Sequence, residues 1–169
     1  KGIMVVGHDM LGHGQSVRNQ DELGYFFEEH EVYLVKDVEK LRNIISKQYP
    51  DKPYYTLGHS MGSFLTTLYI QQYGLHLQGA IIMGTGYQAG YKLAFGKLVC
   101  KLLAKRKGWM YRSPFVNKMA LESNNKPFTP ARTKFDWLTR DNQVVDEYCA
   151  NPLNTFVFTL NGFYTLFSL

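Results

Sequence analysis

The stretch YYTLGHSMG, residues 54–62, combines an apolar run with the pattern G-x-S-x-G. Residues 54–57 predict a buried strand, and residues 61–73 predict a helix that ends at Gly74 as its C′ residue. Ser60 then lies on a sharp turn between strand and helix, where the backbone is strained and the hydroxyl points out of the sheet. This context favours a nucleophilic serine over a purely structural glycine corner.

The residues around Ser60 have predicted roles in the same turn. Gly58 and Gly62 are expected to be small because the helix approaches neighbouring strands there. The Met61 N–H, at the helix N-terminus, is expected to donate to an oxyanion. His59 is expected to pack or hydrogen-bond behind the serine. The predicted catalytic groups are therefore Ser60 and Met61, while Gly58, His59 and Gly62 shape the turn.

Other apolar runs alternate with helical patterns in the first half of the chain. Residues 3–6 predict a strand, followed by a glycine-rich loop over 7–14, and residues 77–83 predict a third strand. A helix is predicted over 30–48, with Glu28, Glu29 and Glu31 complementing its dipole. This alternation is typical of a parallel α/β sheet.

After Gly86 the pattern becomes helical. The first helix, over 91–106, is expected to bury one face that holds several apolar residues: Leu93, Leu98, Val99, Leu102 and Leu103. Shorter helices are predicted over 115–121 and from an Asp141 cap to Cys149, before Pro152. Residues 1–86 are therefore predicted to form a sheet core, and residues 87–169 a helical cap.

Composition excludes several functional classes. The 169 residues are 45% apolar with a net charge of +5, which describes a globular chain. The basic residues accompany no nucleic-acid-binding motif, so no nucleic-acid partner is expected. Cys100 and Cys149 match no metal or redox spacing, which favours reduced thiols, a cytoplasmic location and no metal. Neither end predicts a signal peptide or a membrane span.

A second motif, HDMLGHGQS at residues 8–16, follows the first predicted strand. Together with GHSMG at 58–62, it resembles the monoacylglycerol lipase and lysophospholipase branch of the α/β-hydrolases, which is grouped with the serine aminopeptidase-like (S33) hydrolases. The helical stretch after Gly86 falls where this family inserts its cap. Residues 130–138 and 151–153 also resemble cap segments of that family.

The resemblance implies a Ser-Asp-His triad, in which only Ser60 maps onto this chain. The family's aspartate and histidine follow the cap, and its second oxyanion donor precedes Lys1, so we expect a central piece of a longer protein that is inactive alone. His76 is too far along its helix to serve as the base, at roughly 20 Å. His8 and His13 are expected to shape their loop. The cap aspartates Asp136, Asp141 and Asp146 are expected to cap helices or form ion pairs.

The predicted function is that of a serine carboxylester hydrolase acting on monoacylglycerol, lysophospholipid or a similar acyl ester. No metal or organic cofactor is implied, and nothing indicates an oligomeric state. The basic helix 91–107 has two interpretations: a solvated face, or a surface that approaches anionic lipid. Two alternatives remain open: another activity of the fold, such as a peptidase or thioesterase, and a catalytically inactive binding module.

Overall fold

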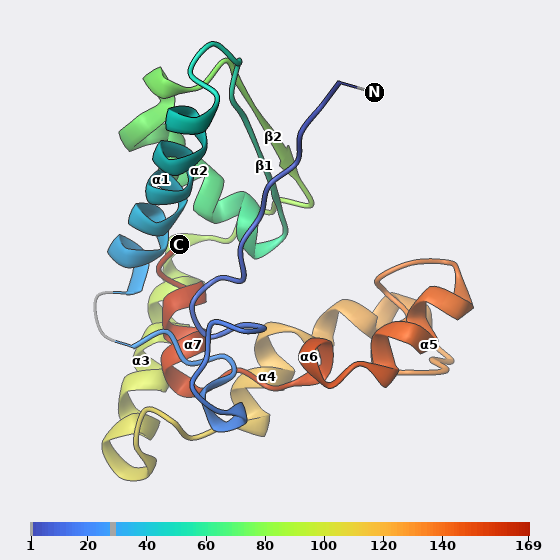
Figure 1. Cartoon of the computed structure of the whole chain (residues 1–169). Helices are drawn as coiled ribbons and strands as arrows, with labels where there is room; N and C mark the ends of the chain where they lie inside the picture. Colours follow the sequence, from blue (N-terminus) through green and yellow to red (C-terminus); the bar gives the residue numbers. More distant parts are fainter. Residues whose placement is uncertain (1, 28–29) are drawn as a thin grey trace.

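The computed structural model describes residues 2–27 and 30–169 (Figure 1). In these ranges two parallel strands, β1 (Tyr55–His59) and β2 (Gly79–Met83), form the sheet, with Leu57 opposite Ile81. Helix α2 (Met61–Tyr73) connects them. This strand–helix–strand unit confirms the predicted parallel α/β architecture.

The remaining elements of the described chain are helical. They are η1 (Gln20–Glu22), α1 (His30–Gln48), η2 (Gly74–His76), α3 (Gly90–Lys107), α4 (Pro114–Ala120), η3 (Glu122–Phe128), α5 (Asn142–Ala150), α6 (Pro152–Thr155) and α7 (Leu160–Leu166). No strand follows residue 86 in the described chain, as predicted. Among the described helices, none is long and apolar enough to cross a membrane.

The strand predicted over 3–6 is wrong. Ile3 and Val5 are extended but 84% and 87% exposed, and no ladder joins them to β1 or β2. A strand requires a neighbour for its backbone N–H and C=O groups, and the described residues supply none here. Apolar character alone therefore predicted an extended backbone but not its pairing.

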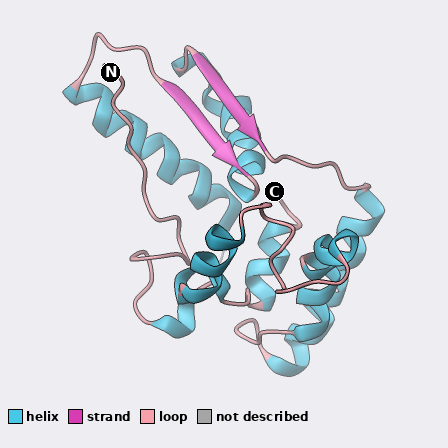
Figure 2. Ribbon diagram, turned by 90° about the vertical axis from the view of Figure 1, so that its right-hand side faces the viewer, coloured by secondary structure: helices cyan, strands magenta, loops and turns pink. Residues whose placement is uncertain are grey.

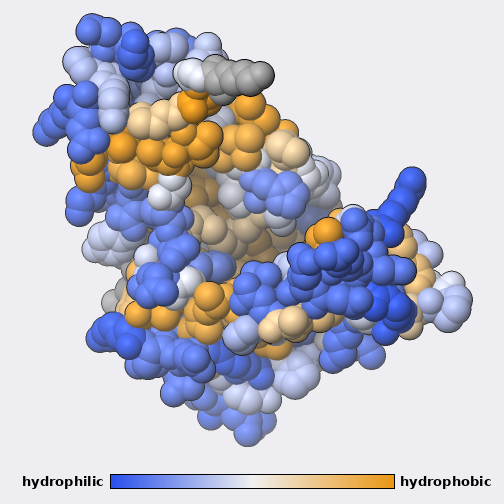
Figure 3. All heavy atoms as spheres, turned by 45° about the vertical axis from the view of Figure 1, so that its right-hand side comes forward, coloured by the Kyte–Doolittle hydropathy of each residue, from blue (hydrophilic) through white to orange (hydrophobic). Residues whose placement is uncertain are grey.

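Two helices form one layer beside the strands. Helix α2 packs against β1 and β2, and α1 packs on α2 (Figures 1 and 2). The core of this half consists of Phe26, Leu34, Val35, Leu65 and Tyr69. Figure 3 shows apolar surface over the upper part of the molecule, where the strands lie and where Tyr55, Leu57 and Ile81 are exposed. One face of the sheet is therefore open.

The buried face of α3 differs from the prediction. Leu98 and Leu102 were expected in the core but are 52% and 55% exposed, whereas Gly96 and Cys100 are buried against α7. A Cβ at position 96 would lie 2.8 Å from the Phe167 ring, so glycine is what allows this close packing. Helix α3 is apolar on two sides, and α7 covers the side with the smaller residues.

Two helices end at residues that were predicted to cap them, Asp141 before α5 and Gly74 after α2. The Asp141 carboxylate accepts hydrogen bonds from the N–H groups of Gln143 and Val144, which confirms the predicted cap of α5. Helix α2 spans Met61–Tyr73 as predicted, but Gly74 is its C-cap rather than its C′ residue. Gly74 has φ −56° because the chain continues into the 3-10 turn η2. Glu28 and Glu29 lie outside the described residues, as does the side chain of Glu31.

A buried amide joins the end of the chain to the loop before α1. Asn161 is buried, its Oδ1 accepts the Phe26 N–H at 2.7 Å, and its Nδ2 donates to the Phe27 carbonyl at 2.8 Å. The Arg112 guanidinium donates to the carbonyls of Leu23 and Val157. Polar contacts between residues far apart in the sequence thus attach the helical half, residues 87–169, to the sheet half, residues 1–86.

A carboxylate joins α1 to α2. Glu39 on α1 accepts hydrogen bonds from the Tyr69 hydroxyl at 2.6 Å and from Arg42 at 2.7 and 2.9 Å, and His76 Nδ1 lies 3.2 Å away. The hydrogen bond from Arg42 is the main cause that lowers the pKa of Glu39 from 4.5 to about 2. The ionised carboxylate therefore stabilises the contact between the helices.

Glu39→Gln should reduce the free energy of unfolding at neutral pH by about 1–3 kcal/mol, because hydrogen bonds to a charged acceptor are lost. Since the folded-state pKa is below the unfolded one, this contribution is complete above pH 4.5 and is lost as the pH falls toward 2. Urea unfolding at several pH values measures it, with Asp51→Asn, an exposed carboxylate, as control. A difference between wild type and variant that is equal at pH 7 and pH 3 would contradict this role.

Candidate functional site

Ser60 occupies a strained turn between β1 and α2. Its φ of 52° and ψ of −120° lie in a region that side-chain-bearing residues rarely adopt. The Ser60 N–H donates to the Met83 carbonyl at 3.1 Å, and its carbonyl accepts from the Ser63 N–H at 2.9 Å and the Ser63 hydroxyl at 2.5 Å. Both backbone groups of Ser60 are thus held, while its side chain is exposed.

The two glycines of the turn have different roles. A Cβ at Gly58 would overlap the Gly62 carbonyl oxygen and the Thr66 hydroxyl, so glycine is required where α2 crosses β1. A Cβ at Gly62 would meet no described atom within 4 Å. The predicted steric reason is confirmed for Gly58 and is wrong for Gly62, where a Cβ would enter open space.

Met61 is the first residue of α2, directly beside the Ser60 hydroxyl. Its backbone N–H has no hydrogen-bond partner in the part of the chain that the structure describes. The first N–H groups of a helix lack intrahelical acceptors, and the helix dipole is positive at this end. A free donor therefore adjoins the serine, in the position expected of an oxyanion donor.

His59 is the last residue of β1 and lies opposite Met83, and its ring lies beside Gly84. A Cβ at Gly84, where φ is +56°, would lie 2.9 Å from His59 Nε2. No sequence signal singles out Gly84, because a lone glycine after a strand is common. The ring of His59 therefore packs against Gly84, but the residue as a whole is exposed.

The loop over residues 8–16 is held by Asp9 and His13. The Asp9 carboxylate accepts the Gln15 N–H at 2.7 Å, and the Ser16 hydroxyl donates to the Asp9 carbonyl at 2.7 Å. The His13 ring contacts Phe26, Phe156 and Phe158 at centroid distances of 5.5–5.6 Å.

Burial in this aromatic cluster lowers the pKa of His13, against the opposing effect of a hydrogen bond from its Nδ1 to the Leu11 carbonyl. The packing of the ring against three phenylalanines suits a structural position. The contacts of His13 agree with the predicted loop-shaping role.

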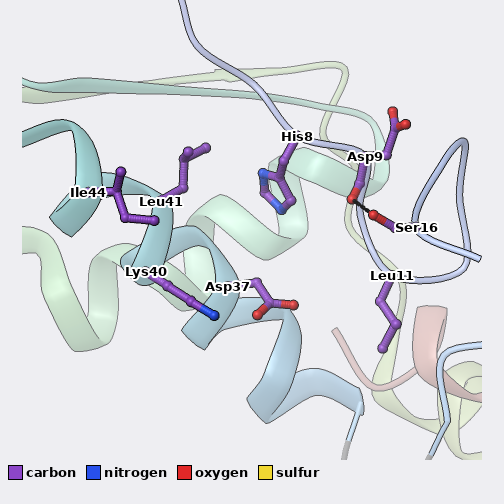
Figure 4. Close-up of a pocket in the computed structure, with 8 residues that line it drawn as sticks. All are labelled: His8, Asp9, Leu11, Ser16, Asp37, Lys40, Leu41 and Ile44. Carbon is purple, nitrogen blue, oxygen red and sulfur yellow. Dashed lines mark hydrogen bonds between the residues drawn. The ribbon is translucent and has the colours of Figure 1, made fainter.

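A cavity of about 260 Å³ lies between this loop and α1 (Figure 4). Figure 4 shows its loop residues facing those of the helix. Its lining combines polar and apolar groups: His8, Asp9, Leu11, Ser16, Asp37, Lys40, Leu41 and Ile44. Ser60 and Met61 are absent from this lining. The cavity and the serine turn are therefore separate features of the described chain.

The serine turn faces the helical half. The carboxyl ends of both strands point toward the helices that follow residue 87 (Figure 1). Figure 3 shows a hollow in the surface between the apolar upper part and the polar lower arm of the molecule. In open parallel sheets, ligands bind outside the carboxyl ends of the strands. The position of Ser60 agrees with this rule.

No described histidine side chain hydrogen-bonds to Ser60. His76 lies beyond the far end of α2, as predicted, and its Nδ1 lies 3.2 Å from the Glu39 carboxylate. The three cap aspartates also have structural partners: Asp141 caps α5, Asp136 holds the Thr133 N–H, and Asp146 pairs with Arg132. The described chain thus supplies a candidate nucleophile and a candidate oxyanion donor, but no histidine hydrogen-bonded to the serine hydroxyl.

A parallel sheet whose strand turns into a helix through a strained, exposed serine defines the α/β-hydrolase class. Consistent with this, the fold matches the crystal structure of a thermostable carboxyl esterase from Bacillus coagulans in complex with glycerol, with a TM-score of 0.83 and 25% identity. The match covers 95% of this chain and 52% of the esterase.

The whole chain, residues 1–169, matches the family described as serine aminopeptidase, S33, and it belongs to that family. Over 81 residues it is 33% identical to the monoglyceride lipases of Rattus norvegicus and Mus musculus and 31% identical to that of Homo sapiens. These alignments cover 48% of this chain and 25% of each lipase. The expected family resemblance is confirmed.

Gly58→Ala should reduce the free energy of unfolding by more than about 2 kcal/mol, because the new methyl group forces α2 away from β1. Gly62→Ala is the matched control and should be neutral or slightly stabilising, since alanine favours a helix where space is open. Urea unfolding of both variants measures the difference. Equal effects of the two substitutions would contradict the packing described for this turn.

Proposed function

We propose that the protein carrying this chain is a serine carboxylester hydrolase with Ser60 as its nucleophile. The observation that carries the proposal is the Ser60 turn, with positive φ, an exposed side chain and the free Met61 N–H beside it. Proteins accept such backbone strain chiefly where function requires it. The carboxyl esterase and monoglyceride lipase relatives make an acyl ester the favoured substrate class.

In the proposed reaction, the Ser60 oxygen attacks the ester carbonyl carbon and a base takes the hydroxyl proton. The carbonyl oxygen becomes an oxyanion that the Met61 N–H stabilises. The alcohol leaves with a proton, and water then releases the acyl group from Ser60. No described histidine side chain hydrogen-bonds to Ser60, so we place the base outside this chain and expect the chain alone to be inactive.

The substrate is proposed to be a monoacylglycerol, a lysophospholipid or a similar ester with one acyl chain. The hollow beside the strand ends and the aromatic residues of the predicted cap, 87–169, suit an apolar chain. Phe115 and Phe128 are exposed in the predicted cap and provide apolar surface there. Glycerol, with which the Bacillus coagulans esterase is in complex, is the alcohol that a monoacylglycerol would release.

A peptidase is the second candidate, because the family description itself names a serine aminopeptidase. The same turn and oxyanion donor serve amide and ester carbonyls alike, so they do not separate the two reactions.

The free thiols of Cys100 and Cys149 agree with a proposed cytoplasmic location.

The longest product of the gene that encodes this chain should hydrolyse p-nitrophenyl acyl esters and monoacylglycerols. Ser60→Ala should lower its kcat by at least about a thousand-fold, because the nucleophile is lost. Ser46→Ala on α1 is the matched control and should keep full activity. Aminoacyl p-nitroanilides, assayed in parallel, separate an esterase from a peptidase.

Residues 1–169 alone should hydrolyse these esters no faster than buffer. Full ester hydrolysis by Ser60→Ala would refute the proposed nucleophile. Hydrolysis of the anilides without hydrolysis of the esters would refute the substrate class and favour the peptidase.

A further inference from the structure

The outer face of α3 carries an exposed apolar stripe. We define the α3 stripe by four residues that are 52–73% exposed: Tyr91, Phe95, Leu98 and Leu102. At 100° per residue, their spacing of four, three and four places them within one narrow sector of the helix. Their side chains therefore form a continuous apolar strip along the helix.

The stripe lies opposite the face that α3 buries. Gly96 and Cys100 face α7, which lies against α3 in Figure 1, and the helix periodicity places Leu98 and Leu102 on the other side. A solvated helix face is normally polar, whereas this one is not. Exposed apolar rows of this kind mark surfaces that contact another phase or molecule.

Cations flank the stripe on both sides. Residues 90–112 contain seven Lys and Arg and no Asp or Glu. By helix periodicity, Lys101 and Lys105 lie along one side of the stripe, and Lys92 and Arg106 along the other. All four are exposed. Since the whole chain carries a net charge of only +5, the remainder of the chain is net acidic.

We propose that the α3 stripe and its flanking cations form a docking surface for an anionic lipid bilayer. The helix would lie flat on the membrane, with the stripe at the boundary between head groups and acyl chains and the cations beside lipid phosphates. The long Lys and Arg side chains can reach the phosphates while their stems stay in contact with apolar groups.

Charge complementarity favours an anionic bilayer as the partner of the α3 stripe. Positive charge is concentrated on α3, and the net acidic remainder of the chain is repelled by an anionic surface, so the protein approaches with α3 first. Trp109 and Met110 extend the apolar surface just beyond the C-terminus of α3, at 39% and 42% exposure. A tryptophan at the end of such a helix is well placed for the interface of a bilayer.

This surface contains neither Ser60 nor Met61, so lipid docking is a property separate from the proposed hydrolysis. The docking surface rests on the proposed function and deepens it, because it would bring a hydrolase of esters with one acyl chain to a surface that contains its substrates. Vesicle binding and ester hydrolysis are measured in separate assays, so the loss of one property is distinguishable from the loss of the other.

Flotation of the longest product of the gene that encodes this chain, mixed with lipid vesicles, tests the proposal. Vesicles of phosphatidylcholine with about 30 mol% phosphatidylglycerol should bind at least about ten-fold more protein than pure phosphatidylcholine, and salt should weaken the binding. Lys105→Gln with Arg106→Gln should lower the partition coefficient about thirty-fold. Leu98→Gln with Leu102→Gln should lower it more than about ten-fold.

Two matched controls locate the contact. Lys47→Gln with Lys52→Gln removes two exposed cations away from α3, and Leu57→Gln removes an exposed apolar residue from the open sheet face. Both controls should bind as wild type does, with unchanged circular dichroism for all variants. The proposal is overturned by equal binding to neutral and anionic vesicles, by no binding, or by an equal loss in either control.

Discussion

The close approach of α2 to β1 at Gly58 is the constraint on which the rest of the structure depends. Only a residue without a Cβ allows the Gly62 carbonyl and the Thr66 hydroxyl to lie where they do. This approach leaves a single sharp turn between strand and helix, and Ser60 occupies it with positive φ. The hydroxyl is thereby exposed beside the free N–H of Met61, so one packing contact fixes both candidate catalytic groups.

The helical half is positioned by a few buried polar contacts. Asn161 accepts from and donates to the loop at Phe26 and Phe27, and the Gly24 carbonyl accepts the Thr159 hydroxyl at 2.8 Å. A buried amide with satisfied hydrogen bonds specifies one arrangement more sharply than apolar packing does. These contacts hold the helices that follow residue 87 on the side toward which the strands end (Figure 1).

Local sequence signals predicted the elements well and their partners poorly. The G-x-S-x-G pattern and helical periodicity predicted α2 and the Ser60 turn, because both depend on neighbouring residues. The strand at 3–6 was wrong because pairing depends on what lies beside it. Leu98 and Leu102 were misplaced because α3 is apolar on two sides, and only the packing of α7 decides between them. The role of Asn161 was missed since its partners are over 130 residues away.

The most direct test of Ser60 as nucleophile is intact-mass spectrometry of the longest product of this gene, with and without a fluorophosphonate probe. Such probes react with a serine only when a base and an oxyanion site activate it. The proposed function predicts a single adduct that maps to Ser60 and is absent from Ser60→Ala. An adduct on another residue, or an unlabelled protein that still hydrolyses esters, would contradict it.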